Sequence, residues 1–400
     1  NDLPESVHFR NSIAIRPVTK VCPCEICRSI GAWFIGAAQS TISGLPNERP
    51  ESQMLEAYIK ERSLKELESR IPEHRQEVRA ALEAMADDRP CSPRQALMLA
   101  HCYRLDGEFA KSKQVLDDLL ANGASDVSVK LELAKVFHAQ GDLDSAIRLL
   151  TEATNARPEL VDNWLLLKDY LQQDGQDQAS ANAMSQYEMI KAFNDHLKTA
   201  EKAFFNAEFV RADNICRKLL EKVPGEVRVL RLLARLATEF RHFEISQSIL
   251  EKCVQVRPAD TALGFDYARS LLDCKKFQPA LEQCNRLIQL APGEIDSYGL
   301  KAEILFNLGR YEEAAGIFRE LSQVLQKPEA YLVQLGKVLT TMGETSEAID
   351  CFQRAIAAEP TLGQAYWELA SLKTYRFSDD ETAAMQQALE KGELTAINTV

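Results

Sequence analysis

The chain has 400 residues, of which 46% are hydrophobic and 26% charged, and its net charge at pH 7 is -12. This length exceeds what one hydrophobic core usually supports, so we expect several domains or an array of repeats. A protein that binds nucleic acid needs basic surface to displace counterions from phosphates, so the negative charge argues against such a partner. No apolar run reaches the roughly 18–20 residues of a membrane span. We therefore expect a cytoplasmic protein without a nucleic-acid or membrane partner.

The N-terminal segment, residues 1–50, is rich in Pro, Gly, Ser and Asn and keeps no hydrophobic period, so we expect it to be irregular. It contains Cys22, Cys24 and Cys27. Thiolates this close together can converge on one zinc ion or iron–sulfur cluster, but four ligands are usual and no fourth is evident. We predict no metal site and no cofactor, and these three cysteines remain the one weak alternative.

Residues 51–92 follow with two helical patterns, over Glu51–Ser69 and Glu73–Met85, separated by Pro72. Apolar residues recur at helical spacing in both. The end of a repeat array needs a partner that covers its exposed apolar surface. We therefore predict that residues 51–92 form an N-terminal helical cap.

The prolines reveal an internal repeat. Pro224, Pro258 and Pro292 are 34 residues apart, and Pro360 lies two such periods further on. Proline favours the end of a helix, so each marks the end of a repeat. Other residue types recur in phase with them. The alanines twelve residues before the repeat end are Ala146, Ala212, Ala280, Ala314 and Ala348. The eighth position of the repeat is a small residue, namely Ala134, Ala200, Ala234, Ala268, Ala302 and Gly336. Many fifteenth positions are glycine, namely Gly107, Gly141, Gly175, Gly309 and Gly343.

This pattern resembles the tetratricopeptide repeat, a unit of two antiparallel helices. The resemblance implies an all-α, right-handed superhelical solenoid of about eight helix-turn-helix repeats over residues 93–362, with binding along its concave groove. Neighbouring units would bury each other's apolar stripes in one continuous core. The third unit, 161–192, is two residues short and has Ser180 where alanine is expected. We therefore expect its second helix to be irregular.

Residues 363–400 are predicted to form C-terminal capping helices. Gly363 begins a further first helix, and Ser378 with Glu381 has the spacing of a capping box, which predicts a helix to about Glu390. The sequence AYWELASLKTYRFSDDETAAMQQAL resembles the junction at which a tetratricopeptide array precedes a sulfotransferase domain in bacterial proteins. The resemblance implies a scaffold linked to a sulfotransferase. The phosphate loop with which that family binds 3′-phosphoadenosine-5′-phosphosulfate (PAPS) does not occur in these 400 residues.

No catalytic motif was found, neither a metal-binding His-Glu-x-x-His nor a nucleophile elbow nor a Gly-rich nucleotide loop. The leading hypothesis is a non-catalytic scaffold that binds a protein or peptide and recruits it to a linked sulfotransferase domain. Two alternatives stay open: the chain is part of an active sulfotransferase, or it is a stand-alone structural adaptor. The exposed end repeats also allow self-association.

Arginines are concentrated on one first helix. Arg228, Arg231 and Arg235 have the spacing i, i+3, i+7 and therefore share one helical face. At the positions that face the groove, the adjacent units offer Arg269 and Lys198. The guanidinium fork suits carboxylates, so these five residues are the predicted site for an acidic peptide. The alternative is a solvated face balanced by Glu201, Asp266 and Asp273.

Overall fold

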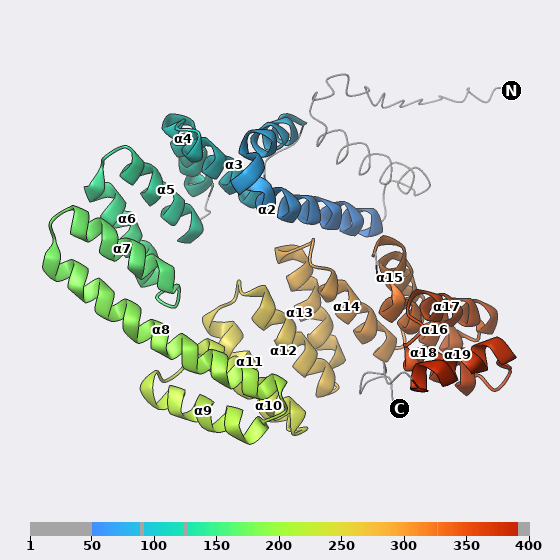
Figure 1. Ribbon diagram of the computed structural model, residues 1–400. Helices are drawn as coiled ribbons and strands as arrows, with labels where there is room; N and C mark the ends of the chain where they lie inside the picture. Colours follow the sequence, from blue (N-terminus) through green and yellow to red (C-terminus); the bar gives the residue numbers. More distant parts are fainter. Residues whose placement is uncertain (1–49, 89–91, 123–126, 326, 391–400) are drawn as a thin grey trace, which may run out of the picture.

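The computed structural model describes residues 50–88, 92–122, 127–325 and 327–390, which form eighteen α-helices and no strand. Helices adjacent in the chain pack against each other from α2 to α18 (Figure 1). The first helices of the units are α3 (Pro93–Leu105), α5 (Val127–Ala139), α7 (Val161–Gln173), α10 (Val227–Glu239), α12 (Thr261–Asp273), α14 (Ile295–Asn307) and α16 (Glu329–Met342). The second helices are α4 (Phe109–Ala121), α6 (Leu143–Ala156), α9 (Phe209–Lys222), α11 (Phe243–Val256), α13 (Phe277–Leu290), α15 (Tyr311–Val324) and α17 (Thr345–Ala358). The predicted all-α solenoid is confirmed.

Small side chains lie where the two helices of a unit approach most closely. The alanines at the eighth position and those twelve residues before the repeat end are all completely buried. At the eighth position of the last unit even a methyl group would not fit, since a Cβ on Gly336 would lie 2.5 Å from the ring of Phe352. In three units serine replaces the second alanine, and each hydroxyl has a first-helix partner: Ser112 donates to the carbonyl of Ala100, Ser180 to that of Lys168, and Ser246 accepts from the hydroxyl of Thr238. The close approach thus survives the substitution without an unpaired hydroxyl.

The third unit departs from the prediction. Its second helix is not irregular: α8 (Asp177–Phe205) runs unbroken for 29 residues and also forms the first helix of the fourth unit. No Gly or Pro occurs between Asp177 and Phe205, and the missing two residues remove the turn that would separate the helices. The middle of α8 is largely solvent-exposed, with Met189 60% exposed. The apolar cores on either side of it are separate clusters.

The N-terminal cap, α2 (Pro50–Asp88), consists of two helical stretches joined by a kink at His74, where φ is -126° and ψ is 37°. The two predicted helical patterns are thus present, with the break two residues after Pro72. Apolar side chains of α2 are buried against the first unit in one cluster: Leu64, Leu67, Ile71, Val78, Leu82, Met98, Leu99, Cys102 and Tyr103. The cap therefore covers the apolar surface that α3 would otherwise expose.

At the other end, α18 (Gly363–Ser371) and α19 (Asp379–Glu390) follow the last unit. The predicted capping box of α19 is confirmed. The backbone N–H of Ser378 donates to the Glu381 carboxylate at 2.8 Å, and the backbone N–H of Glu381 donates to Ser378 Oγ at 3.2 Å. No helix in the described ranges is long and apolar enough to cross a bilayer.

The array curls so that distant units meet (Figure 1). Arg257, at the end of α11, lies 3.2 Å from the carboxylate of Glu159, between α6 and α7, so the fifth unit contacts the end of the second. Lys65 of α2 lies 4.0 Å from Glu294, next to the start of α14, and α2 also contacts α15. The cap therefore touches the seventh unit as well as the first.

Turns between paired helices use a left-handed residue. The predicted turn glycines all have positive φ, including Gly141 at 84°. Other units place Ala207, Arg241 and Lys275 in the same conformation, with φ of 57–59°. A side chain costs about 1–2 kcal/mol in this region, whereas glycine adopts it freely.

We therefore expect Lys275→Gly to raise the free energy of unfolding by roughly 0.5–1 kcal/mol, since relief of the strain outweighs the added chain entropy. The converse change, Gly141→Ala, should lower it by about 1 kcal/mol. Urea denaturation followed by circular dichroism measures both. A loss of stability in Lys275→Gly would contradict the assignment of strain to this turn.

Candidate functional site

The first helices of the sixth, seventh and eighth units enclose a cavity of about 250 Å³. Its lining comes from α12, α14 and α16, with Phe318 of α15 beneath: Phe265, Arg269, Asp296, Gly299, Leu300, Glu303, Phe318, Ala330, Tyr331 and Gln334. We call the surface formed by α10, α12, α14, α16 and the second half of α8 the first-helix face. The cavity is an apolar recess with charged groups at its rim, which is the usual make-up of a binding pocket.

Gly299 makes room for the aromatic wall of the cavity. A Cβ at this position would lie 2.9 Å from Cε1 of Tyr331, so a larger residue would push the tyrosine ring away from α14. Burial raises the pKa of Tyr331, and its hydroxyl donates to no acceptor among the described residues. The sequence analysis missed both residues. The available signal was a glycine at the fifth position of the seventh unit, where the sixth unit has Phe265.

Two of the predicted site arginines form ion pairs between neighbouring units. Arg231 Nε lies 2.5 Å from Oδ2 of Asp266, and a terminal nitrogen of Arg269 lies 2.5 Å from Oε2 of Glu303. Asp266 was one of the balancing carboxylates considered in the sequence analysis, whereas Glu303 was not. Each pair connects the first helices of adjacent units, so these arginines also stabilise the stacking of the array.

The remaining predicted residues differ in their surroundings. Arg228 donates to the carboxylate of Glu226 and to Oδ1 of Asn194, both at 2.8 Å. Lys198 is exposed on α8. Arg235 is half-buried, and its guanidinium carbon lies 4.6 Å from the centre of the Phe204 ring and 5.4 Å from that of Phe205.

Asp273, another carboxylate weighed in the sequence analysis, lies at the end of α12 close to the charges of Arg269 and Glu303. Burial raises its pKa, and the positive charge of Arg269 only partly opposes this effect. The cavity itself is lined by two carboxyl groups, Asp296 and Glu303, beside Arg269, and Asp273 lies within reach of the charges of Arg269 and Glu303. This end of the first-helix face is more acidic than the α10 end.

A second polar cluster, which sequence reasoning missed, lies between the first and second units. Glu132 of α5 is only 7% exposed, and its Oε1 lies 2.6 Å from Arg104 Nε and 3.0 Å from His101 Nδ1. Lys135 is 3.6 Å from the other carboxylate oxygen. Burial by itself would raise the pKa of Glu132, but the hydrogen bonds from His101 and Arg104 outweigh it and lower the pKa to about 2. This cluster joins two units electrostatically.

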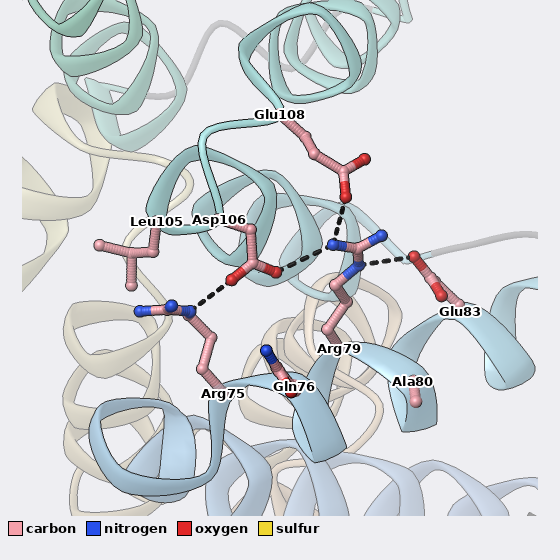
Figure 2. A pocket seen from close by; sticks show the side chains of 8 residues that line it. All are labelled: Arg75, Gln76, Arg79, Ala80, Glu83, Leu105, Asp106 and Glu108. Carbon is pink, nitrogen blue, oxygen red and sulfur yellow. Dashed lines mark hydrogen bonds and ion pairs between the residues drawn. The ribbon is translucent and has the colours of Figure 1, made fainter.

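A hollow of about 550 Å³ lies between the cap and the turn of the first unit (Figure 2). Figure 2 shows Arg79 reaching three carboxylates, at distances of 2.9 Å to Glu83, 2.9 Å to Asp106 and 2.5 Å to Glu108. Arg75 adds a second contact to Asp106 at 2.6 Å. These arginines hold the pKa of Asp106 below its ordinary value, although burial opposes the shift. Because the charges are already paired with each other, the network serves to attach α2 to the array.

The cysteines of the array are free thiols: Cys102, Cys216, Cys253, Cys284 and Cys351 are buried, and Cys274 is partly buried. Burial raises the pKa of Cys284 to about 12 and that of Cys102 to about 11, so both stay protonated and unreactive at neutral pH. In the described part of the chain no group of three metal-ligating side chains was found. Cys22, Cys24 and Cys27 lie outside the described residues.

Comparison with known proteins supports the repeat assignment. A model of the N-terminal tetratricopeptide region of Psidin matches residues 269–391, and a general tetratricopeptide-repeat model matches residues 97–160. No curated protein sequence matches the chain.

Solved structures also resemble parts of the chain. A tetratricopeptide protein of Thermus thermophilus, TTC0263, is 13% identical over 45% of this chain and 98% of its own, with a TM-score of 0.40. MamA from Desulfovibrio magneticus RS-1 is 12% identical over 42% of this chain and 96% of its own, with a TM-score of 0.38. A tetratricopeptide repeat protein from Parabacteroides merdae ATCC 43184 is 14% identical over 67% of this chain and 93% of its own, with a TM-score of 0.34.

The helix pairs and the two family models together define the class of this protein. The chain is a tetratricopeptide-repeat solenoid, with repeats recognised both near its N-terminal cap and in its C-terminal third. Proteins of this class act as scaffolds that bind other proteins, because their stacked helices form an extended surface rather than a closed catalytic site.

The low pKa of Glu132 predicts how stability depends on pH. The folded pKa of about 2 lies below the ordinary value of 4.5, so its contribution is complete above pH 4.5 and is lost as the pH falls toward 2. We expect Glu132→Gln to reduce the free energy of unfolding by about 1–3 kcal/mol at pH 6.5, and by less at pH 3.5.

Urea denaturation at the two pH values measures this difference. Glu152→Gln is the matched control, because Glu152 pairs with Lys130 but is 47% exposed, and such a pair contributes about 1 kcal/mol at most. An equal loss of stability in Glu132→Gln at both pH values would show that the carboxylate charge does not matter there.

Proposed function

We propose that this chain is a non-catalytic scaffold that binds a peptide segment of a partner protein along its first-helix face. The cavity of about 250 Å³ between α12, α14 and α16 carries the proposal. It offers one apolar recess of a size suited to a single large side chain, walled by Phe265 and Tyr331, with hydrogen-bonding groups at its rim. Such a recess with a polar rim is the arrangement in which binding energy concentrates at protein interfaces.

The predicted acidic partner is kept as part of this proposal. Arg228, Arg231 and Arg269 already contact carboxylates, so an acidic ligand would have to displace Glu226, Asp266 and Glu303 respectively. Arg235 and Lys198, toward the other end of the face, would accept an acidic ligand without such an exchange. The free, protonated thiols agree with a reducing compartment such as the cytoplasm.

The binding function is tested by filling the cavity. Ala330 lines the cavity but is itself exposed, so Ala330→Trp should occupy the recess without disturbing the core. Peptides selected from a random displayed library on the immobilised wild-type chain should bind this variant at least tenfold more weakly, which is about 1.4 kcal/mol or more. Calorimetric titration of two or three selected peptides measures the affinities.

The control is Ala357→Trp, which adds the same side chain at an exposed position on the second helix α17. This variant should keep the wild-type affinity. Selected peptides that bind wild type and Ala330→Trp equally would place the binding surface elsewhere, and failure to select any peptide would contradict a peptide-binding function.

We also propose, as a second function, that the scaffold serves a sulfotransferase. The support is the residue pattern of 363–390, in which α18 is followed by a capped α19 held by Ser378 and Glu381. A scaffold next to an enzyme would present the bound partner to it as substrate. Neither family model that matches the chain names such an enzyme.

The coding sequence beyond Val400 tests the link to a sulfotransferase. We expect it to continue into a strand–loop–helix with a Gly/Ser/Thr phosphate loop for PAPS. A stop codon there, or an unrelated domain, would reject the proposal and leave the adaptor function. A second measurement is transfer from labelled PAPS, which should be observed only with the longer protein.

A further inference from the structure

Among the arginines of the first-helix face, Arg235 has an unusual environment. In the part of the chain that the structure describes, no carboxylate lies within ion-pair distance of it, whereas Arg228, Arg231 and Arg269 each contact one. Its guanidinium carbon instead lies 4.6 Å from the centre of the Phe204 ring and 5.4 Å from that of Phe205. A ring face attracts the positive charge but does not take up the guanidinium N–H groups as a carboxylate does, so these groups can donate to a ligand.

The rings around Arg235 continue into an exposed apolar row. The ring centres of Phe205 and Phe204, of Phe204 and Phe209, and of Phe209 and Phe240 are 5.7–5.8 Å apart, and we call these four residues the aromatic edge. The two ends of this row are exposed, Phe205 to 72% and Phe240 to 50%. An exposed phenylalanine leaves a large apolar area hydrated, which favours a partner that covers it.

The charge of this region differs from that of the whole protein. Residues 198–245 contain ten Lys and Arg against seven Asp and Glu, a net charge of +3, while the chain carries -12. Lys198, exposed on α8, belongs to this segment. A segment of net positive charge in an acidic protein favours acidic partners over basic ones, at a range set by the salt concentration.

We propose that Arg235 and the aromatic edge form a docking site for an acidic partner segment that carries an aromatic or large aliphatic residue next to Asp or Glu. The partner carboxylate accepts hydrogen bonds from the N–H groups of Arg235, and its apolar neighbour packs on the exposed ring of Phe205. A carboxylate bound to a half-buried guanidinium forms a charge-assisted hydrogen bond, and the apolar contact next to it excludes water. This inference rests on the proposed function and adds the chemistry of the partner.

The probe is a fluorescein-labelled peptide containing Asp-Asp-Trp-Glu-Leu-Glu, compared with the same peptide in which Asn and Gln replace the acids. Fluorescence anisotropy should show that the full chain binds the acidic peptide at least tenfold more tightly than the amide peptide. Arg235→Gln should weaken binding of the acidic peptide at least tenfold. Phe205→Ser should weaken it at least fivefold, and this exposed position lets the variant fold.

The matched control is Arg217→Gln on α9, which removes the same charge from a side chain that is 70% exposed and paired with Asp213. It should bind within twofold of wild type. Equal affinity of wild type and Arg235→Gln, or no detectable binding of the acidic peptide by wild type, overturns the inference. If the displayed-library peptides bind Ala330→Trp weakly but Arg235→Gln normally, this inference fails while the proposed function stands.

Discussion

The close approach of two small residues, one in each helix of a unit, is the contact on which the rest of the structure depends. Ala134 and Ala146 in the second unit, like their counterparts in later units, have no exposed surface. Because their side chains are short, the two helices lie near enough for larger residues to interdigitate with the next unit. Without that spacing neither helix could bury its apolar stripe, and the stacked array would lose its continuous core.

The path of the array changes where this regular packing is interrupted. Merging two helices into α8 removes one turn and leaves apolar clusters on both sides that do not join. Distant units also contact each other, since Arg257 with Glu159 links the fifth unit to the end of the second. On the opposite side, the Lys65–Glu294 pair links the cap to the start of α14. Both contacts are polar and partly exposed, so the apolar stacking determines the path of the chain and the ion pairs secure it.

Charge has two different roles on the first-helix face. The pairs Arg231–Asp266 and Arg269–Glu303 each join neighbouring units, and they neutralise positive charge that a ligand would otherwise meet. Arg235 is stabilised by aromatic rings instead, so its hydrogen-bonding groups stay available. The face is therefore graded, with an available cation and exposed rings near α8 and α10 and an acidic recess near α14. A partner that contacts both ends of the face must place one kind of group near α8 and α10 and another kind near α14. Such a partner can bind in one orientation only.

By itself the sequence determined the helix pairs, the positions of the turns and the capping box at Ser378, because each depends on residues close together in the chain. It also predicted, from their helical spacing, that Arg228, Arg231 and Arg235 share one face of α10. It did not predict that α8 is continuous, since a shortened unit is compatible with either an irregular or a merged helix. Only the tertiary structure decided which arginines are already paired and that Gly299 and Tyr331 form a recess. Those facts depend on side chains about 34 residues apart meeting across the stack, and the local pattern does not contain that information.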